Sequence, residues 1–154
     1  MTHGDRPIVE YLPISQIIAG LSLALTFGGM TFFSVVMAPL VFTKLPPKIA
    51  GGFIRQVFPW YYLAMGTASL VALIGLLVNT GLRGNWETLL TALVLAGFVF
   101  ARQMLLPLIN RARDAELAGE TGAHHRFTRL HGISVLINAV QWLAVLTALT
   151  LVLM

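Results

Sequence analysis

The sequence predicts an all-α integral membrane protein, a four-helix bundle with a short amphipathic interfacial helix between spans one and two. Of its 154 residues, 57% are apolar and only 10% are charged, and the mean hydropathy is +0.83. A soluble domain carries roughly 25% charged residues, and a domain of this size has mostly surface to cover. The composition therefore excludes a solvated globule, a disordered chain and a nucleic-acid-binding domain.

Gaps between charged residues locate the spans. Uncharged stretches of 33, 27 and 25 residues follow Glu10, Arg55 and Arg129, and a further stretch is interrupted only by Arg102. A helix needs roughly 20 residues to cross a hydrocarbon core of about 30 Å. These runs are continuous rather than short and alternating, which excludes barrel strands. We expect one domain over residues 1–154, with spans at about 14–42, 60–79, 86–109 and 130–153.

The stretch after span one has the pattern of a short helix. Pro47 suits the first position of a helix. Ile49 and Phe53 then fall on one side of that helix, with Lys48 and Arg55 on others. This arrangement predicts an amphipathic helix lying in the inner membrane interface.

The basic residues predict the orientation, because Lys and Arg gather in cytoplasmic loops. Two basic residues, Arg6 and Arg83, fall on one face of the membrane. Seven fall on the other: Lys44, Lys48, Arg55, Arg111, Arg113, Arg126 and Arg129. We expect both termini outside, and we expect the basic cytoplasmic face to contact anionic lipid.

Arg102 is the one basic residue inside a span. A central Arg costs about 2.5 kcal/mol or more, and snorkelling toward the headgroups lowers that cost. Asn110 shares its helical face, and Asp114 and Glu116 follow where they can pair with basic residues. A structural Arg that fixes helix depth and a contact to a substrate anion both remain open.

Span four carries a polar stripe. At 100° per residue, an arc of about 80° holds four polar side chains, which must face protein or water rather than lipid. These are His131, Ser134, Asn138 and Gln141. Hydrogen bonding between helices is one interpretation. A pocket for a ligand, an ion or a proton is the other, and His131 is a weak candidate for binding a metal or a haem iron.

The remaining sequence motifs indicate no particular reaction or cofactor. There is no cysteine, and no phosphate-binding loop, dinucleotide-binding loop or nucleophile elbow is present. Pro39-Leu40-Val41 and Pro107-Leu108-Ile109 close spans one and three alike, which indicates a tandem repeat of helical hairpins. Each proline removes a backbone donor, so we expect a bend at Pro39.

Three blocks of the chain resemble the transmembrane protein 205-like family, a four-span domain of unknown function. They are PLVFTKLPPKIAGGFIRQVFPWYY with FARQMLLPLINRARD, and FTRLHGISVLINAV. The residues that carry the resemblance include Phe58, Pro59, Tyr61 and Pro107, together with Arg102 and His131. The resemblance implies a bacterial inner-membrane protein and supplies no catalytic residues. A weaker likeness is to copper-resistance D-type proteins and HemJ-type protoporphyrinogen oxidases.

Three hypotheses for the function follow. The first is a non-enzymatic membrane protein, whose polar residues hold the helices together and whose basic face meets anionic lipid or a partner. The second is a haem, porphyrin or metal binder, with His131 as ligand and haem or copper as cofactor. The third is a small exporter, which requires a homo-oligomer because four spans rarely enclose a pathway alone.

Overall fold

In the computed structural model, residues 13–80 and 85–154 are described, and all regular structure within these ranges is helical. The helices form four long rods. The first rod consists of α1 (Ile14–Phe32), η1 (Phe33–Met37) and α2 (Ala38–Lys44) in succession, and the second rod is α3 (Pro47–Thr80). The third rod consists of α4 (Trp86–Phe100), η2 (Ala101–Leu105) and α5 (Leu106–Leu117) in succession, and the fourth rod is α6 (Ala123–Leu153). All four rods are long and apolar enough to cross a membrane, which agrees with the predicted all-α membrane architecture.

The short interfacial helix expected before span two is not a separate element. Residues 47–58 are the first turns of α3, which continues through Pro59 into the span. Only Leu45 and Pro46 separate α2 from α3, so the segment turns straight back along the bundle. Its apolar side packs on α2, where Ala50 and Ile54 are buried against Val41.

The rods form a ring in which each contacts two neighbours. α1 packs on α3 and α6, and α4 packs on the same two helices. Glycines allow the closest approaches, as expected for helices packing in lipid. A Cβ on Gly29 would lie 2.7 Å from Met65 Sδ, and one on Gly97 would lie 2.6 Å from Gln141 Nε2.

The second hairpin (α4–α6) repeats the first (α1–α3) at a constant spacing in the first rod of each. The five-residue π-helical segments η1 and η2 begin at Phe33 and Ala101, which are 68 positions apart. Pro39 and Pro107 follow them at the same spacing.

The second rods repeat as well, at a spacing of 76 positions. This spacing separates the first residues of α3 and α6, Pro47 and Ala123. It also separates Met65 from Gln141, the side chains that face the two glycines. The repeat suggested by three residues of sequence therefore extends over both hairpins.

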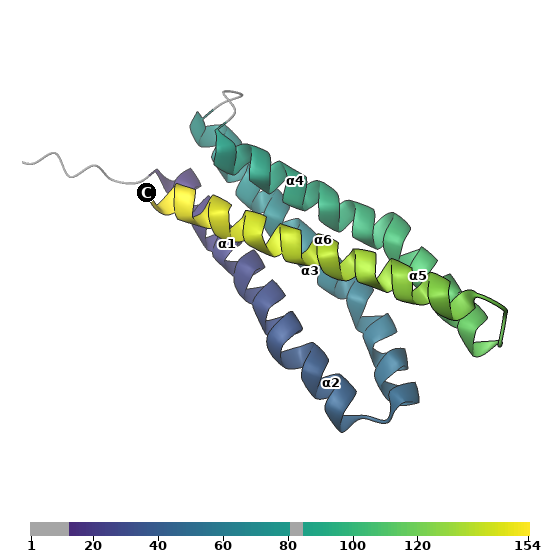
Figure 1. Ribbon diagram of the computed structural model, residues 1–154. Helices are drawn as coiled ribbons and strands as arrows, with labels where there is room; N and C mark the ends of the chain where they lie inside the picture. Colours follow the sequence, from purple (N-terminus) through teal and green to yellow (C-terminus); the bar gives the residue numbers. More distant parts are fainter. Residues whose placement is uncertain (1–12, 81–84) are drawn as a thin grey trace, which may run out of the picture.

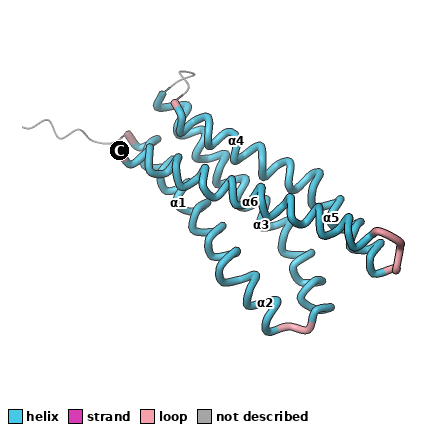
Figure 2. The backbone as a smooth tube through the Cα atoms, in the orientation of Figure 1, coloured by secondary structure: helices cyan, strands magenta, loops and turns pink. Residues whose placement is uncertain are grey.

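The two hairpins diverge at one end of the molecule (Figure 1). There α2 packs on α3, and α5 packs on α6. The two short connections at this end, 45–46 and 118–122, lie far from the C-terminus (Figure 2). We call this end, formed by α2, α5 and the first turns of α3 and α6, the wide end. The seven basic residues predicted to face the cytoplasm belong to it.

Candidate functional site

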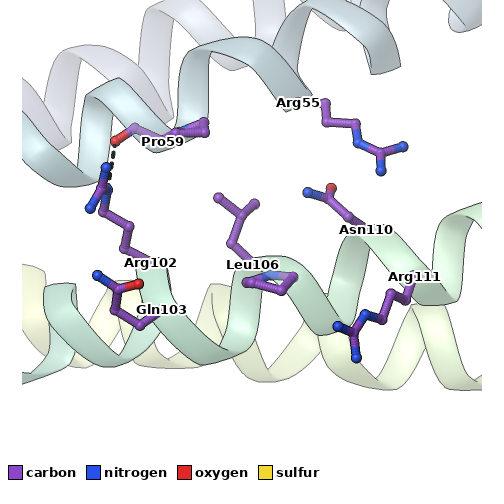
Figure 3. Close-up of a pocket in the computed structure, with 8 residues that line it drawn as sticks. Arg55, Pro59, Arg102, Gln103, Leu106, Asn110 and Arg111 are labelled. Atoms are coloured by element: carbon purple, nitrogen blue, oxygen red, sulfur yellow. Dashed lines mark hydrogen bonds between the residues drawn. The ribbon is translucent and has the colours of Figure 1, made fainter.

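A pocket of about 450 Å³ lies at the wide end, between the first half of α3 and the segment formed by η2 and α5 (Figure 3). Six of its residues recur on one face of that segment because a helix repeats every three to four positions. The lining residues are Arg55, Pro59, Arg102, Gln103, Leu106, Pro107, Asn110 and Arg111.

Arg102 lies at the inner end of the pocket. It is half-buried, and its Nε donates to the Pro59 carbonyl at 3.3 Å, which ties η2 to α3 (Figure 3). Within residues 13–80 and 85–154, no other hydrogen bond and no carboxylate partner of this guanidinium is present. Its two terminal nitrogens are therefore available to a ligand.

Arg55 lies at the opposite side of the pocket and is already paired. Its two terminal nitrogens donate to the two carboxylate oxygens of Asp114 at 2.6 and 2.9 Å. Both side chains are about half exposed, at 47% and 52%. This bidentate pair links the two hairpins across the wide end, and no carboxylate is among the described residues that line the pocket.

The rest of the pocket offers donors without matching acceptors. Arg111 is exposed and has no acidic partner among the described residues. The amides of Gln103 and Asn110 make no hydrogen bond to those residues either. Guanidinium and amide donors that line a pocket without a carboxylate suit an oxyanion, because charge-assisted bonds to phosphate or carboxylate oxygens are the strong ones.

Several residues predicted from the sequence meet here. Arg102 and Asn110 line the pocket, as do Pro59 and Pro107. The predicted pairing of the acidic residues is confirmed, since Asp114 binds Arg55, and Glu116 binds Arg113 at 2.6 Å.

Phe58 and Tyr61 flank Pro59 and position it. Phe58 stacks on Tyr62 with ring centroids 5.4 Å apart, and Tyr61 stacks on Phe33 at 4.5 Å. These rings hold the middle of α3 against η1. Of the residues that carry the family resemblance, Pro59, Arg102 and Pro107 therefore line the pocket, and Phe58 and Tyr61 lie beside Pro59 in α3.

Sequence reasoning did not name Arg55, Gln103 and Arg111 as site residues. In the sequence, Arg55 and Arg111 indicate only the orientation of the protein in the membrane, as basic residues in any loop do. At 100° per residue, Asn110 falls within about 80° of Arg102, whereas Arg111 falls about 180° away, so regular helical spacing gives no indication of Arg111.

The polar stripe of α6 does not converge on a single site. Gln141 is buried and donates to the Val94 carbonyl at 2.9 Å. Asn138 donates to Ser34 Oγ at 3.3 Å. Both of these bonds join α6 to another rod.

The half of the stripe nearer the wide end makes no such bond to another rod in the described part of the chain. Ser134 Oγ donates within its own helix, to the carbonyl of His131 at 2.9 Å. The His131 ring is exposed and stacks on Phe127 at 5.8 Å. In the described ranges, no three His, Asp or Glu side chains gather as a metal site would require.

The hairpin repeat relates the two features that the sequence singled out. At a spacing of 68 positions, Ser34 in η1 is the counterpart of Arg102 in η2. At a spacing of 76 positions, His131 in α6 is the counterpart of Arg55 in α3. The surface between α6 and the segment formed by η1 and α2 is thus the uncharged relative of the Arg102 pocket.

Comparison with known proteins gives one match. A family model described as "Domain of unknown function (DUF4149)" matches residues 21–118. These residues include the whole pocket. No curated protein and no solved structure matches the chain.

Proposed function

Since the chain belongs to the family described as domain of unknown function (DUF4149), we propose a function from the geometry of the pocket. The protein is a non-enzymatic, multi-pass membrane protein that binds an anionic ligand at the wide end. Its finer assignment, to the transmembrane protein 205-like type and to a bacterial inner membrane, rests on the motifs around Pro59 and Pro107 and belongs to this proposal.

The unpaired guanidinium of Arg102 carries the proposal. A cation at membrane depth costs about 2.5 kcal/mol or more unless it is paired or reaches water. Arg102 donates one hydrogen bond, to a neutral carbonyl. An anion in the pocket would supply the missing countercharge, and Gln103, the neighbour of Arg102, offers a further free donor.

The charge distribution supports the cytoplasmic leaflet as the source of that anion. The wide end carries seven basic residues, which is the bias expected of a cytoplasmic face. Anionic lipids of that leaflet attract each nearby Lys or Arg by about 1 kcal/mol. The proposed partners are therefore the bilayer and its anionic headgroups.

The test compares thermal unfolding in nanodiscs of phosphatidylcholine alone and with increasing phosphatidylglycerol. We expect the anionic lipid to raise the Tm of the wild-type protein and to raise that of Arg102→Gln clearly less. Ser34→Ala changes the counterpart of Arg102 on the uncharged surface and is the matched control, with a wild-type response expected. An equal gain for Arg102→Gln would refute the proposal.

Two other functions stay predictions of the sequence. Haem, porphyrin or copper binding through His131 predicts a coloured or metal-loaded purified protein, which a visible spectrum and metal analysis would detect. Export through a homo-oligomer predicts an assembly of several chains in the bilayer. The geometry favours the anion site over both, because the Arg102 guanidinium lines the pocket without a carboxylate partner among the described residues.

A further inference from the structure

We propose that the Arg55–Asp114 ion pair is a reversible latch that sets the width of the Arg102 pocket, and that it opens when anionic lipid takes Arg55 from Asp114. This inference rests on the proposed function and concerns the regulation of the same site. Arg55 and Arg102 lie at opposite ends of the pocket (Figure 3). The latch therefore acts on the space between the hairpins and not on the anion at Arg102.

Two polar contacts join α3 to the third rod, one at each end of the pocket. At the inner end, Arg102 Nε donates to the Pro59 carbonyl at 3.3 Å. At the outer end, both terminal nitrogens of Arg55 donate to the Asp114 carboxylate, at 2.6 and 2.9 Å. Closer to the wide-end connections than Arg102, no other hydrogen bond or ion pair joins the two hairpins in the described part of the chain. The ion pair is thus the polar contact that holds the outer side of the pocket together.

Three of the four rods have a place to bend at the level of the pocket. Pro59 lies inside α3, and Pro39 and Pro107 follow the π-helical segments of the first and third rods. Prolines and π turns are the usual sites of helix kinks, because they interrupt the regular backbone hydrogen bonds. Beyond these sites α2 packs on α3 and α5 packs on α6, each within its own hairpin. We therefore expect the outer parts of the two hairpins to move as two units.

The ion pair is too exposed to act as a permanent link. Both side chains are about half exposed. A pair at this exposure contributes little to stability, because water and salt screen it and two long side chains must be ordered. Anionic headgroups attract a nearby Arg with a comparable free energy. A sufficiently anionic membrane surface can therefore take Arg55 from Asp114.

The hairpin repeat shows that the ion pair is present on one side only. The counterparts of its two members are Pro46, in the connection between α2 and α3, and His131. That side keeps an inner contact, in which Asn138 donates to Ser34 Oγ at 3.3 Å. No ion pair lies beyond this contact among the described residues. The outer pair is thus an addition to the shared backbone plan, at the side that holds the pocket.

Distances between two spin labels in nanodiscs, measured by pulsed electron paramagnetic resonance, test the latch. The chain has no cysteine, so Gly51→Cys and Ala118→Cys place one label on each hairpin at the wide end. Both positions are exposed, and a Cβ on Gly51 would meet nothing within 4 Å. In phosphatidylcholine alone we expect one narrow distribution of distances for the otherwise wild-type protein.

Opening should appear as a longer distance. Asp114→Asn should broaden the distribution and lengthen its mean by several ångströms. Glu116→Gln is the matched control and should keep the wild-type distance, because it removes the same charge from α5 but the partners of Glu116, Arg113 and His124, belong to its own hairpin. Arg55→Asp combined with Asp114→Arg reverses the ion pair and should restore the narrow distribution. Adding phosphatidylglycerol should lengthen the wild-type distance and leave that of Asp114→Asn unchanged.

The outcomes separate this inference from the proposed function. Equal distances for Asp114→Asn and Glu116→Gln in phosphatidylcholine would overturn the latch. A wild-type distance that phosphatidylglycerol does not change would overturn its opening by anionic lipid. Both results would leave the anion site in place, since that site is refuted only when Arg102→Gln gains as much Tm from phosphatidylglycerol as the wild type does.

Discussion

Gly97 and Gln141 form a close contact between α4 and α6. The Gln141 amide is buried and donates to the Val94 carbonyl at 2.9 Å, one turn before Gly97. A Cβ on Gly97 would lie 2.6 Å from its Nε2 and 2.9 Å from its Cδ. The absence of a side chain at position 97 is therefore what makes room for this polar contact between helices.

We predict that Gly97→Ala lowers stability by about 1–3 kcal/mol, because the displaced amide is left buried without its hydrogen bond. The measurement is denaturant unfolding in detergent, followed by circular dichroism. Gly66→Ala is the control, since its Cβ would meet Phe98 at an ordinary 3.7 Å. Replacing a helical glycine there should be neutral or stabilising. Equal stability of the two variants would show that the Gln141 contact has no energetic role.

The sequence identified polar residues in apolar helices but not their partners. Arg102 and Gln141 stand out because a polar group in a span needs an explanation wherever it points. Whether such a group meets a carbonyl, a hydroxyl or a pocket depends on helix rotation, which a period of 3.6 leaves free. Arg55 and Arg111 do not stand out in this way, since both lie outside the predicted spans, where basic residues mark the cytoplasmic side.

At the scale of the element, the two π-helical segments set the direction of the rods beyond them. Pro107 has no N–H to donate to the Gln103 carbonyl, and Pro39 leaves Val35 in the same situation. A π turn places one extra residue in the ladder, and at the end of η2 the N–H of Leu106 bonds to the Ala101 carbonyl five residues back. The prolines predicted a local disturbance, but not its π-helical form.

We predict that Pro107→Ala weakens anionic-lipid binding severalfold, with helical content preserved. A regular helix through η2 would turn Arg102 by up to about 100° relative to α5, the rotation of one residue. Arg102 and Asn110 would then no longer face the same pocket. The measurement is the shift in Tm on adding phosphatidylglycerol to nanodiscs.

Pro39→Ala makes the equivalent change in η1 and leaves the pocket intact, so it should bind lipid as the wild type does. If both proline variants respond alike, the π turn does not position Arg102.

The continuity of α3 shows where helix prediction failed. An interior proline and an amphipathic start favoured two elements, a short helix at the interface and then a span. The packing of Ala50 and Ile54 on α2 holds the early turns in line with the rest. The continuity of α3 therefore depends on contacts with another rod, and a local sequence pattern does not reveal such contacts.

At the scale of the whole molecule, the basic residues gather at the end where the two hairpins separate. The two hairpins pack along the half that holds the end of α6 and separate toward the half that holds the basic residues (Figure 1). The hairpin repeat explains why both halves diverge there, because each first rod carries its π turn and proline at the same position. The excess of basic residues predicts the orientation in the membrane. It also gives a positive charge to the pocket between the hairpins.

We predict that the wide end faces the cytoplasm. The chain has no cysteine, so one introduced thiol reports on one position. Ala118, between α5 and α6, and Asn85, just before α4, are both exposed and lie at opposite ends of the third rod. In spheroplasts, a membrane-impermeant maleimide should label Asn85→Cys directly and Ala118→Cys only after permeabilisation. Labelling after permeabilisation shows that Ala118→Cys is reactive. The reverse pattern would place the seven basic residues outside, where the Arg102 pocket could not draw its ligand from the cytoplasmic leaflet.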